Sequence, residues 1–233
     1  MDTLHSPRTL DSKPIAPALF AHFVLRSANM QPMVDWYSTV LNMHVVKRND
    51  FICFLTYDEE HHRLAIVNIA GLHAPDPKSW GLAHVAYTFR NVGELLSTYR
   101  RLKKAAIEPY RPIHHGPTLS MYYHDPDGNS VELQVDCFKT KEETAAYFQT
   151  ESFTKNPIGI NFDPETLVAA YEAGASEAEL LRQPAGAHRH AGSRPAALAW
   201  KPYRRSHART TRLLDRQECR TFLIARNTDH SNT

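Results

Sequence analysis

The chain has 233 residues, of which 42% are hydrophobic, and its formal net charge is +2 at pH 7. This composition predicts one large globular domain or two small ones and argues against a disordered chain. No run of 18 apolar residues occurs, so we expect no membrane-spanning helix, and the first residues lack the pattern of a presequence.

The charge is distributed unevenly. Between Pro184 and Thr233 there are ten Lys or Arg and three Asp or Glu residues, a net +7, so residues 1–183 carry −5. We interpret residues 184–233 as a basic, mostly disordered tail. A solvated tail or an out-of-frame extension of the gene accounts for this charge better than nucleic-acid binding, so we expect no nucleic-acid partner. Three scattered cysteines outside any CxxC motif indicate a cytoplasmic chain without disulfides.

Residues 1–17 contain few large apolar side chains, and we interpret them as a flexible N-terminal arm. A strand-like pattern begins at Ala18 with FAHFVLRS, and Asn29 is suited to cap a helix over residues 31–41. The segments MHVVKR, FICFLTYD and RLAIVNIA are then expected to be strands. The loop GLHAPDPKSW ends this first module, whose order is one strand, one helix and three strands.

The same order then occurs a second time. LAHVAYTF is strand-like, a helix is expected over residues 92–106, and further strands are expected near residues 110–113, 119–124 and 130–136.

An internal repeat relates the two modules. A shift of 62 residues places AHFVLRSAN on AHVAYTFRN, so that His22 matches His84 and Asn29 matches Asn91. The repeat predicts an α+β fold over residues 18–138, in which tandem βαβββ modules form one cupped mixed sheet. A binding site is expected in the mouth of this sheet.

The following residues have a helical character. We interpret residues 139–183 as a helical C-terminal extension packed on the domain. KTKEETAAYFQT and DPETLVAAYEAGAS are expected to be helices, the second beginning at Asp163 with Pro164 in its first turn. NPIGINF between them is expected to be extended.

The candidate site begins with Glu132 in the strand-like segment VELQV. Val131 and Leu133 point to one face of such a strand and Glu132 to the other, so by itself Glu132 is most simply a solvent-facing carboxylate. His22 and His84 occupy equivalent positions of the repeat, in strands that we expect to be buried on both faces. Pairing of the two modules would bring both histidines close together, beside the strand that carries Glu132.

Two histidines and one carboxylate on adjacent strands predict a metal site. This facial triad leaves open positions on an octahedral ion, which suits Fe(2+) where O2 and a substrate must both bind, and it also suits Mn(2+). A lone buried histidine is more often a core residue than a ligand. The combination of His22, His84 and Glu132 nevertheless favours metal binding.

With these residues in place, the chain resembles the vicinal oxygen chelate superfamily of glyoxalase I, fosfomycin-resistance proteins and extradiol dioxygenases. The closing motif YYHDPDGNSVEL and the upstream HHG make it most similar to the type I extradiol ring-cleavage dioxygenases of the biphenyl-2,3-diol and catechol type. The resemblance covers about residues 18–138. It implies the metal ligands His22, His84 and Glu132, a catalytic Tyr122 and, with a gap of about two residues, an active-site His115.

The resemblance implies an Fe(2+)-dependent enzyme that cleaves the ring of a catechol-type aromatic diol with O2. His115 would act as general acid and base, and Tyr122 would donate a hydrogen bond to the substrate oxygen. The alternative for both residues is a structural role. His73 is the nearest match to a further family histidine, although its spacing differs, and His114 is a second histidine beside the site.

Alternative functions stay open. Other members of the superfamily use Mn(2+) or Mg(2+) as thiol transferases or glyoxalase-like lyases, and a metal-free module would bind a small planar ligand. Glyoxalase I has a fourth protein ligand at the end of its first module, where this chain has Ala65, which argues for an open three-ligand site. A homo-oligomer is compatible with the resemblance.

Overall fold

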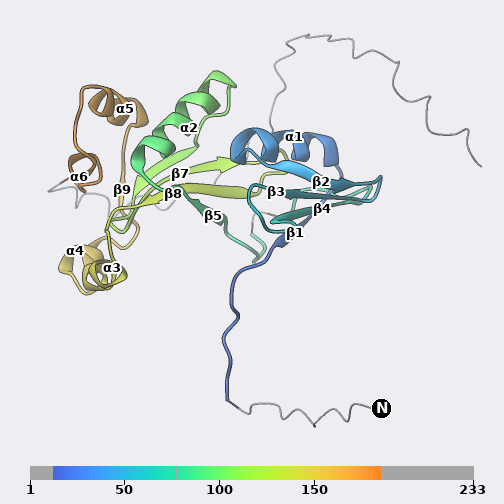
Figure 1. Cartoon of the computed structure of the whole chain (residues 1–233), viewed down its shortest axis with the longest axis horizontal. Coiled ribbons are helices and arrows are strands. Elements are labelled where there is room, and N and C mark those ends of the chain that lie inside the picture. The colour runs from blue at the N-terminus through green and yellow to red at the C-terminus, as the bar shows by residue number, and fades with distance from the viewer. Residues whose placement is uncertain (1–12, 77, 185–233) are drawn as a thin grey trace, which may run out of the picture. The chain divides into compact units, whose positions relative to one another are not determined.

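The computed structural model describes residues 13–76 and 78–184 (Figure 1). Most of the predicted N-terminal arm and nearly all of the predicted basic tail therefore lie outside the described residues. Within the described ranges, no helix is long and apolar enough to cross a membrane. Cys53 and Cys137 are free thiols.

The first module has the predicted order of elements. It contains β1 (Phe23–Ser27), α1 (Met30–Leu41), β2 (His44–Arg48), β3 (Ile52–Thr56) and β4 (Leu64–Asn68). The strands form a sheet of order β1-β4-β3-β2, in which β1 is parallel to β4 and the other pairs are antiparallel.

The second module repeats this arrangement. It contains β5 (Val85–Thr88), α2 (Val92–Lys104), β6 (Arg111–His114), β7 (Thr118–His124) and β8 (Ser130–Asp136). Its sheet has the order β5-β8-β7-β6-β9, with β5 parallel to β8. The predicted α+β class and the tandem βαβββ order are confirmed. The strands form two hydrogen-bonded sheets, one for each module, in place of one continuous sheet, because β1 and β5 each end their own sheet as an edge strand.

Helices α1 and α2 bury apolar stripes against the sheets. In α1 the buried residues include Met33, Trp36 and Val40, and α2 buries Leu95 and Leu102 in the same core. The spacing of three and four residues places these side chains on one helical face. This core is one continuous cluster that draws on both modules. Each sheet therefore has one face covered by a helix, which leaves the opposite face to carry the site.

The two asparagines of the repeat have different roles. The side chain of Asn91 accepts a hydrogen bond from the Glu94 amide at 2.9 Å and caps α2. Asn29 occupies the N-cap position of α1, as predicted, but its side chain makes no capping hydrogen bond to this helix. Its amide donates instead to Asp127 Oδ1 at 2.8 Å, which links the start of α1 to the turn between β7 and β8. Asn29, the counterpart of Asn91 in the repeat, thus connects the first module to the second.

The first strands of both modules are not buried on both faces, in contrast to our expectation. Along β1 and β5, exposed residues alternate with half-buried ones, and His22 and His84 precede these strands in exposed positions. The helices cover only the other face. The histidines are therefore accessible, as ligands or catalytic groups must be.

Residues after β8 form the helices α3 (Lys141–Phe148), α4 (Glu151–Lys155), α5 (Pro164–Glu172) and α6 (Glu177–Leu180), and the short strand β9 (Ile160–Asn161). Strand β9 pairs antiparallel with β6 and so extends the second sheet. Asp163 caps α5 and Pro164 is its first residue, as predicted. The domain limits at residues 138 and 183 stay a prediction.

Candidate active site

Glu132 is the centre of a polar cluster on the second sheet. It lies in β8, opposite Ala86 of β5 and Tyr122 of β7. Its side chain is only 5% exposed, so the solvent-facing interpretation of this carboxylate is wrong. Burial of a carboxylate is costly unless polar or charged partners surround it. Glu132 is therefore expected to have strong partners.

His84 is one of these partners. Its Nε2 atom lies 2.9 Å from Glu132 Oε2, and its side chain is 39% exposed. The ring also meets the ring of Tyr122 edge to face, with centroids 5.3 Å apart. Because His84 directly precedes β5 and β5 pairs with β8, the strand pairing itself brings the imidazole to the carboxylate.

Tyr122 and His115 lie on the other side of Glu132. The Tyr122 hydroxyl is 3.0 Å from His115 Nε2, and that nitrogen is 4.0 Å from Glu132 Oε1. Burial, together with the negative charge of Glu132, raises the pKa of Tyr122, so this phenol stays protonated at neutral pH. Burial lowers the pKa of His115, which favours its neutral form.

The adjacent residues point away from this cluster. The hydroxyl of Tyr123 contacts Met121 Sδ at 3.7 Å inside the core, as expected for a neighbour in a strand. His114 is buried, and its Nε2 atom lies 3.0 Å from the Leu181 carbonyl oxygen of the C-terminal extension. His73 is exposed in the connection between β4 and β5. Neither His114 nor His73 contacts Glu132 in the described structure.

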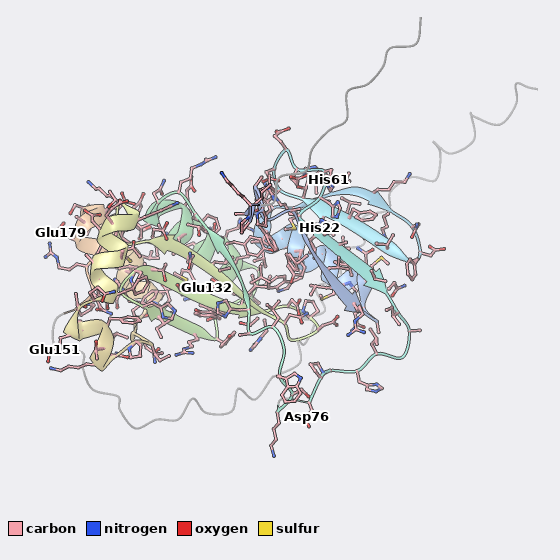
Figure 2. All side chains as sticks on the ribbon, turned by 90° about the horizontal axis from the view of Figure 1, so that it is seen from below. His22, His61, Asp76, Glu132, Glu151 and Glu179 are labelled. Atoms are coloured by element: carbon pink, nitrogen blue, oxygen red, sulfur yellow. The ribbon has the colours of Figure 1, made fainter. Side chains whose placement is uncertain are left out.

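His22 lies in the first module, among other histidines. Its ring is 4.2 Å from the ring of His62 and 6.3 Å from that of His61, measured between centroids. Figure 2 shows His22 beside His61 on the first module and Glu132 on the strands of the second. The sequence did not indicate His61 and His62 as neighbours of His22, since they lie in an irregular loop before β4.

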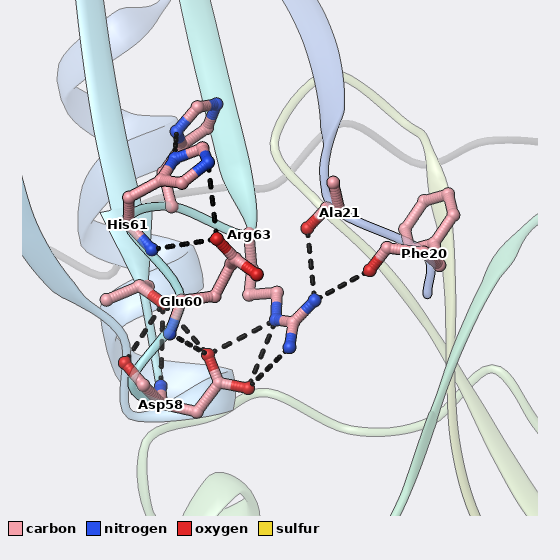
Figure 3. Close-up of polar contacts among 8 residues, drawn as sticks. Phe20, Ala21, Asp58, Glu60, His61 and Arg63 are labelled. Carbon is pink, nitrogen blue, oxygen red and sulfur yellow. Dashed lines mark hydrogen bonds and ion pairs between the residues drawn. The ribbon is translucent and has the colours of Figure 1, made fainter. Parts of the chain in front are cut away.

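Arg63 fixes the chain that leads to His22. Its guanidinium donates to the carbonyl oxygens of Phe20 and Ala21 at 2.6 and 3.1 Å, and it pairs with Asp58 at 3.0 Å (Figure 3). The hydrogen bond from Arg63 lowers the pKa of Asp58. These contacts attach the residues before β1 to Arg63 and so help to position His22.

The fit of a metal ion rests on the donors of the second sheet. A neutral imidazole and a carboxylate in contact are suitable ligands for Fe(2+) or Mn(2+), and a cation would offset the buried charge of Glu132. In the ranges that the structure describes, no group of three His, Cys, Asp or Glu side chains is already arranged to hold a metal. His84 and Glu132 thus fit such an ion as a pair, whereas His22 is not in contact with them.

The strand registers show which residue of the first module corresponds to Glu132. In the first sheet Val24 pairs with Ala65, and in the second Ala86 pairs with Glu132. The repeat offset of 62 residues relates Val24 to Ala86, so Ala65 is the structural counterpart of Glu132. The first module therefore has a methyl group where the second has its carboxylate.

Comparisons with known proteins agree with this architecture. Residues 19–133 match the family model described as the Glyoxalase/Bleomycin resistance protein/Dioxygenase superfamily. Biphenyl-2,3-diol 1,2-dioxygenase 3 of Rhodococcus globerulus is 48% identical over 71% of this chain and 88% of its own length. Biphenyl-2,3-diol 1,2-dioxygenase 2 of the same organism is 47% identical over 66% of this chain and 82% of its own length. A lactoylglutathione lyase of Neisseria meningitidis is 24% identical over 54% of this chain and 95% of its own. The chain belongs to the glyoxalase/bleomycin resistance protein/dioxygenase superfamily.

Proposed function

We propose that this chain is an extradiol dioxygenase that opens the ring of an aromatic vicinal diol with O2. The observation that carries the proposal is the cluster on the second sheet, in which the buried Glu132 contacts His84 on one side and faces the pair of Tyr122 and His115 on the other. The similarity to two biphenyl-2,3-diol dioxygenases at 47–48% identity supports this reaction class.

We further propose that His22, His84 and Glu132 hold Fe(2+), with Mn(2+) as the alternative ion. Bound there, the ion would supply a Lewis acid that makes a diol hydroxyl more acidic and a site at which diol and O2 meet. The absence of a carboxylate at Ala65 supports a set of three protein ligands that leaves positions open for both reactants.

His115 and Tyr122 would transfer a proton and stabilise developing negative charge, respectively. The neutral His115 can accept a proton from a diol hydroxyl at its Nε2 atom, which is the nitrogen that faces Tyr122 and Glu132. The Tyr122 hydroxyl, kept protonated by its raised pKa, can donate a hydrogen bond to a substrate oxygen on which negative charge develops. Both groups belong to the cluster around Glu132, in which the side chains of His115 and His84 are 23% and 39% exposed.

The test is a direct assay with matched variants. The protein is purified without oxygen, loaded with Fe(2+) and mixed with 2,3-dihydroxybiphenyl or catechol, and the yellow ring-opened product and O2 uptake are followed. We expect Glu132→Gln to lower turnover at least about 100-fold and to reduce iron retention. Glu151→Gln is the control, since Glu151 is exposed and, within the part of the chain that the structure describes, its ion pair is with Lys155 of the same helix. Iron-loaded wild-type protein that opens no vicinal diol would overturn the proposal.

A further inference from the structure

His115 is held at both ring nitrogens. Its Nε2 atom faces the Tyr122 hydroxyl at 3.0 Å, whereas its Nδ1 atom lies 2.5 Å from the backbone carbonyl oxygen of Ile158. Ile158 belongs to the C-terminal extension, 43 residues further along the chain. A segment outside the tandem modules therefore contacts the candidate acid–base group directly.

The backbone carbonyl of Ile158 determines which ring nitrogen of His115 is protonated. A carbonyl oxygen only accepts hydrogen bonds, so Nδ1 must be the protonated nitrogen for this contact to form. In the neutral ring Nε2 then has a lone pair, which accepts from the Tyr122 hydroxyl. The same lone pair is the one that a diol proton would meet. The carbonyl thus fixes the tautomer without adding a negative charge.

A tight turn holds the Ile158 carbonyl in place. The Asn156 side chain accepts from the Gly159 amide at 3.0 Å and donates to the Gly159 carbonyl at 2.8 Å, which closes the segment around Ile158. Gly159 has φ +102°, a conformation that side chains rarely adopt. A Cβ atom there would lie 2.3 Å from the His114 carbonyl oxygen and 2.7 Å from His115 Cα. The turn therefore packs directly on the backbone of His115.

We propose that Asn156 is a positioning residue of the active site, which closes the turn at residues 156–159 and thereby holds His115 in the tautomer protonated at Nδ1. The inference rests on the proposed function only in so far as His115 moves a proton for the reaction. The position of that proton is a property of the chain itself and can be measured without metal or substrate.

The first measurement is the tautomer of His115 in metal-free protein, from long-range proton–nitrogen NMR spectra of histidine-labelled samples. The His115 signal is assigned by its loss in His115→Gln. In wild-type protein we expect a protonated Nδ1 and an unprotonated Nε2. Asn156→Ala should shift the population toward the Nε2-protonated form. Asn161→Ala should leave it unchanged, because Asn161 is an exposed residue of the same segment.

The second measurement is turnover of the iron-loaded variants. We expect Asn156→Ala to lower kcat about 10- to 100-fold, a typical effect for a residue that orients an active-site ligand, with a smaller change in KM. Asn156→Asp keeps the acceptor for the Gly159 amide and should retain more activity than Asn156→Ala. Gly159→Ala should shift the tautomer in the same direction as Asn156→Ala.

The two measurements separate the two proposals. An Nδ1-protonated ring that loses this state in Asn156→Ala supports the positioning role even if no diol is cleaved, in which case only the proposed function fails. Wild-type His115 protonated at Nε2, or a tautomer that is the same in wild-type, Asn156→Ala and Gly159→Ala proteins, would overturn the positioning role while the dioxygenase assay stands.

Discussion

At the scale of single residues, the neighbours Tyr122 and Tyr123 differ in role: one side chain joins the candidate active site and the other packs in the core. The two side chains point to opposite faces of β7, so one hydroxyl meets His115 Nε2 at 3.0 Å and the other meets a methionine sulfur in the core. Both residues are buried, so burial alone does not distinguish them. Their hydrogen-bond partners do.

These neighbours allow a matched test of the proposed hydrogen bond to substrate. Tyr122→Phe removes the hydroxyl that faces Glu132 and His115, and we expect kcat to fall about 10- to 100-fold because one donor to the developing charge is lost. Steady-state kinetics and iron content of the purified protein measure the effect, and iron should be retained. Tyr123→Phe should change kcat less than about twofold. Equal losses in the two variants would contradict the role of Tyr122.

At the scale of elements, the C-terminal extension contacts the sheet that carries the candidate site, both by strand pairing and by packing against a glycine. Strand β9 pairs with β6 directly before His115, and α3 places the ring of Tyr147 against Gly116. Gly116 has φ +100°, and a Cβ atom there would lie 2.2 Å from the Tyr147 ring. The turn between β6 and β7 therefore has room for the extension only because residue 116 is glycine.

The contact predicts a specific loss of stability. Gly116→Ala adds a methyl group that collides with Tyr147 and strains a left-handed backbone, so we expect the free energy of unfolding to fall by about 2–4 kcal/mol. Gly174→Ala separates the two causes, because Gly174 also has a positive φ of +88° but, apart from its chain neighbours, no atom of the described residues lies within 4 Å of an added Cβ. Urea unfolding of both variants measures the difference. Equal losses of unfolding free energy in Gly116→Ala and Gly174→Ala would show that the collision with Tyr147 does not contribute to the destabilisation.

At the scale of the whole described structure, Asp125 connects the two modules. It accepts hydrogen bonds from Tyr37 of α1 at 3.0 Å and from the amide of Asn129 at 2.9 Å in the turn between β7 and β8. The Asp125 side chain is fully buried, and this burial raises its pKa to about 6. A carboxyl group that joins two modules thus titrates near neutral pH.

This titration predicts a pH dependence of stability. The pKa of Asp125 is higher in the fold than its ordinary value of 3.8, so its contribution is fully present below that value and is lost as the pH rises through about 6. We expect the unfolding free energy of wild-type protein to fall by about 2–3 kcal/mol relative to Asp125→Asn between pH 4 and 7. Chemical denaturation at several pH values measures this difference. The curve of unfolding free energy against pH for Asp50→Asn, a change at an exposed position, should be parallel to that of wild type. A parallel curve for Asp125→Asn would contradict the prediction.

Much of this organisation could be predicted from the chain alone. The periodicity of apolar residues and the offset of 62 residues predicted two βαβββ modules, because a repeated pattern of buried positions forces a repeated pairing of strands. The module order also predicted that His84 and Glu132 lie close together, whereas Tyr122 and His115 were indicated by the family resemblance. The role of His22 as a third ligand stays a prediction.

Only the tertiary structure showed what the residues outside these strands do. Glu132 is buried beside His84 and His115, which come from other segments, so a strand pattern that placed it on a polar face could not reveal its burial. The Ile158 group that contacts His115 is a backbone carbonyl, which has no residue-specific signal in a sequence, and the Asn156 side chain acts through its bonds to the backbone of Gly159. Local patterns thus determined the elements and their order, whereas contacts between distant segments decided which polar groups are buried together and how His115 is oriented.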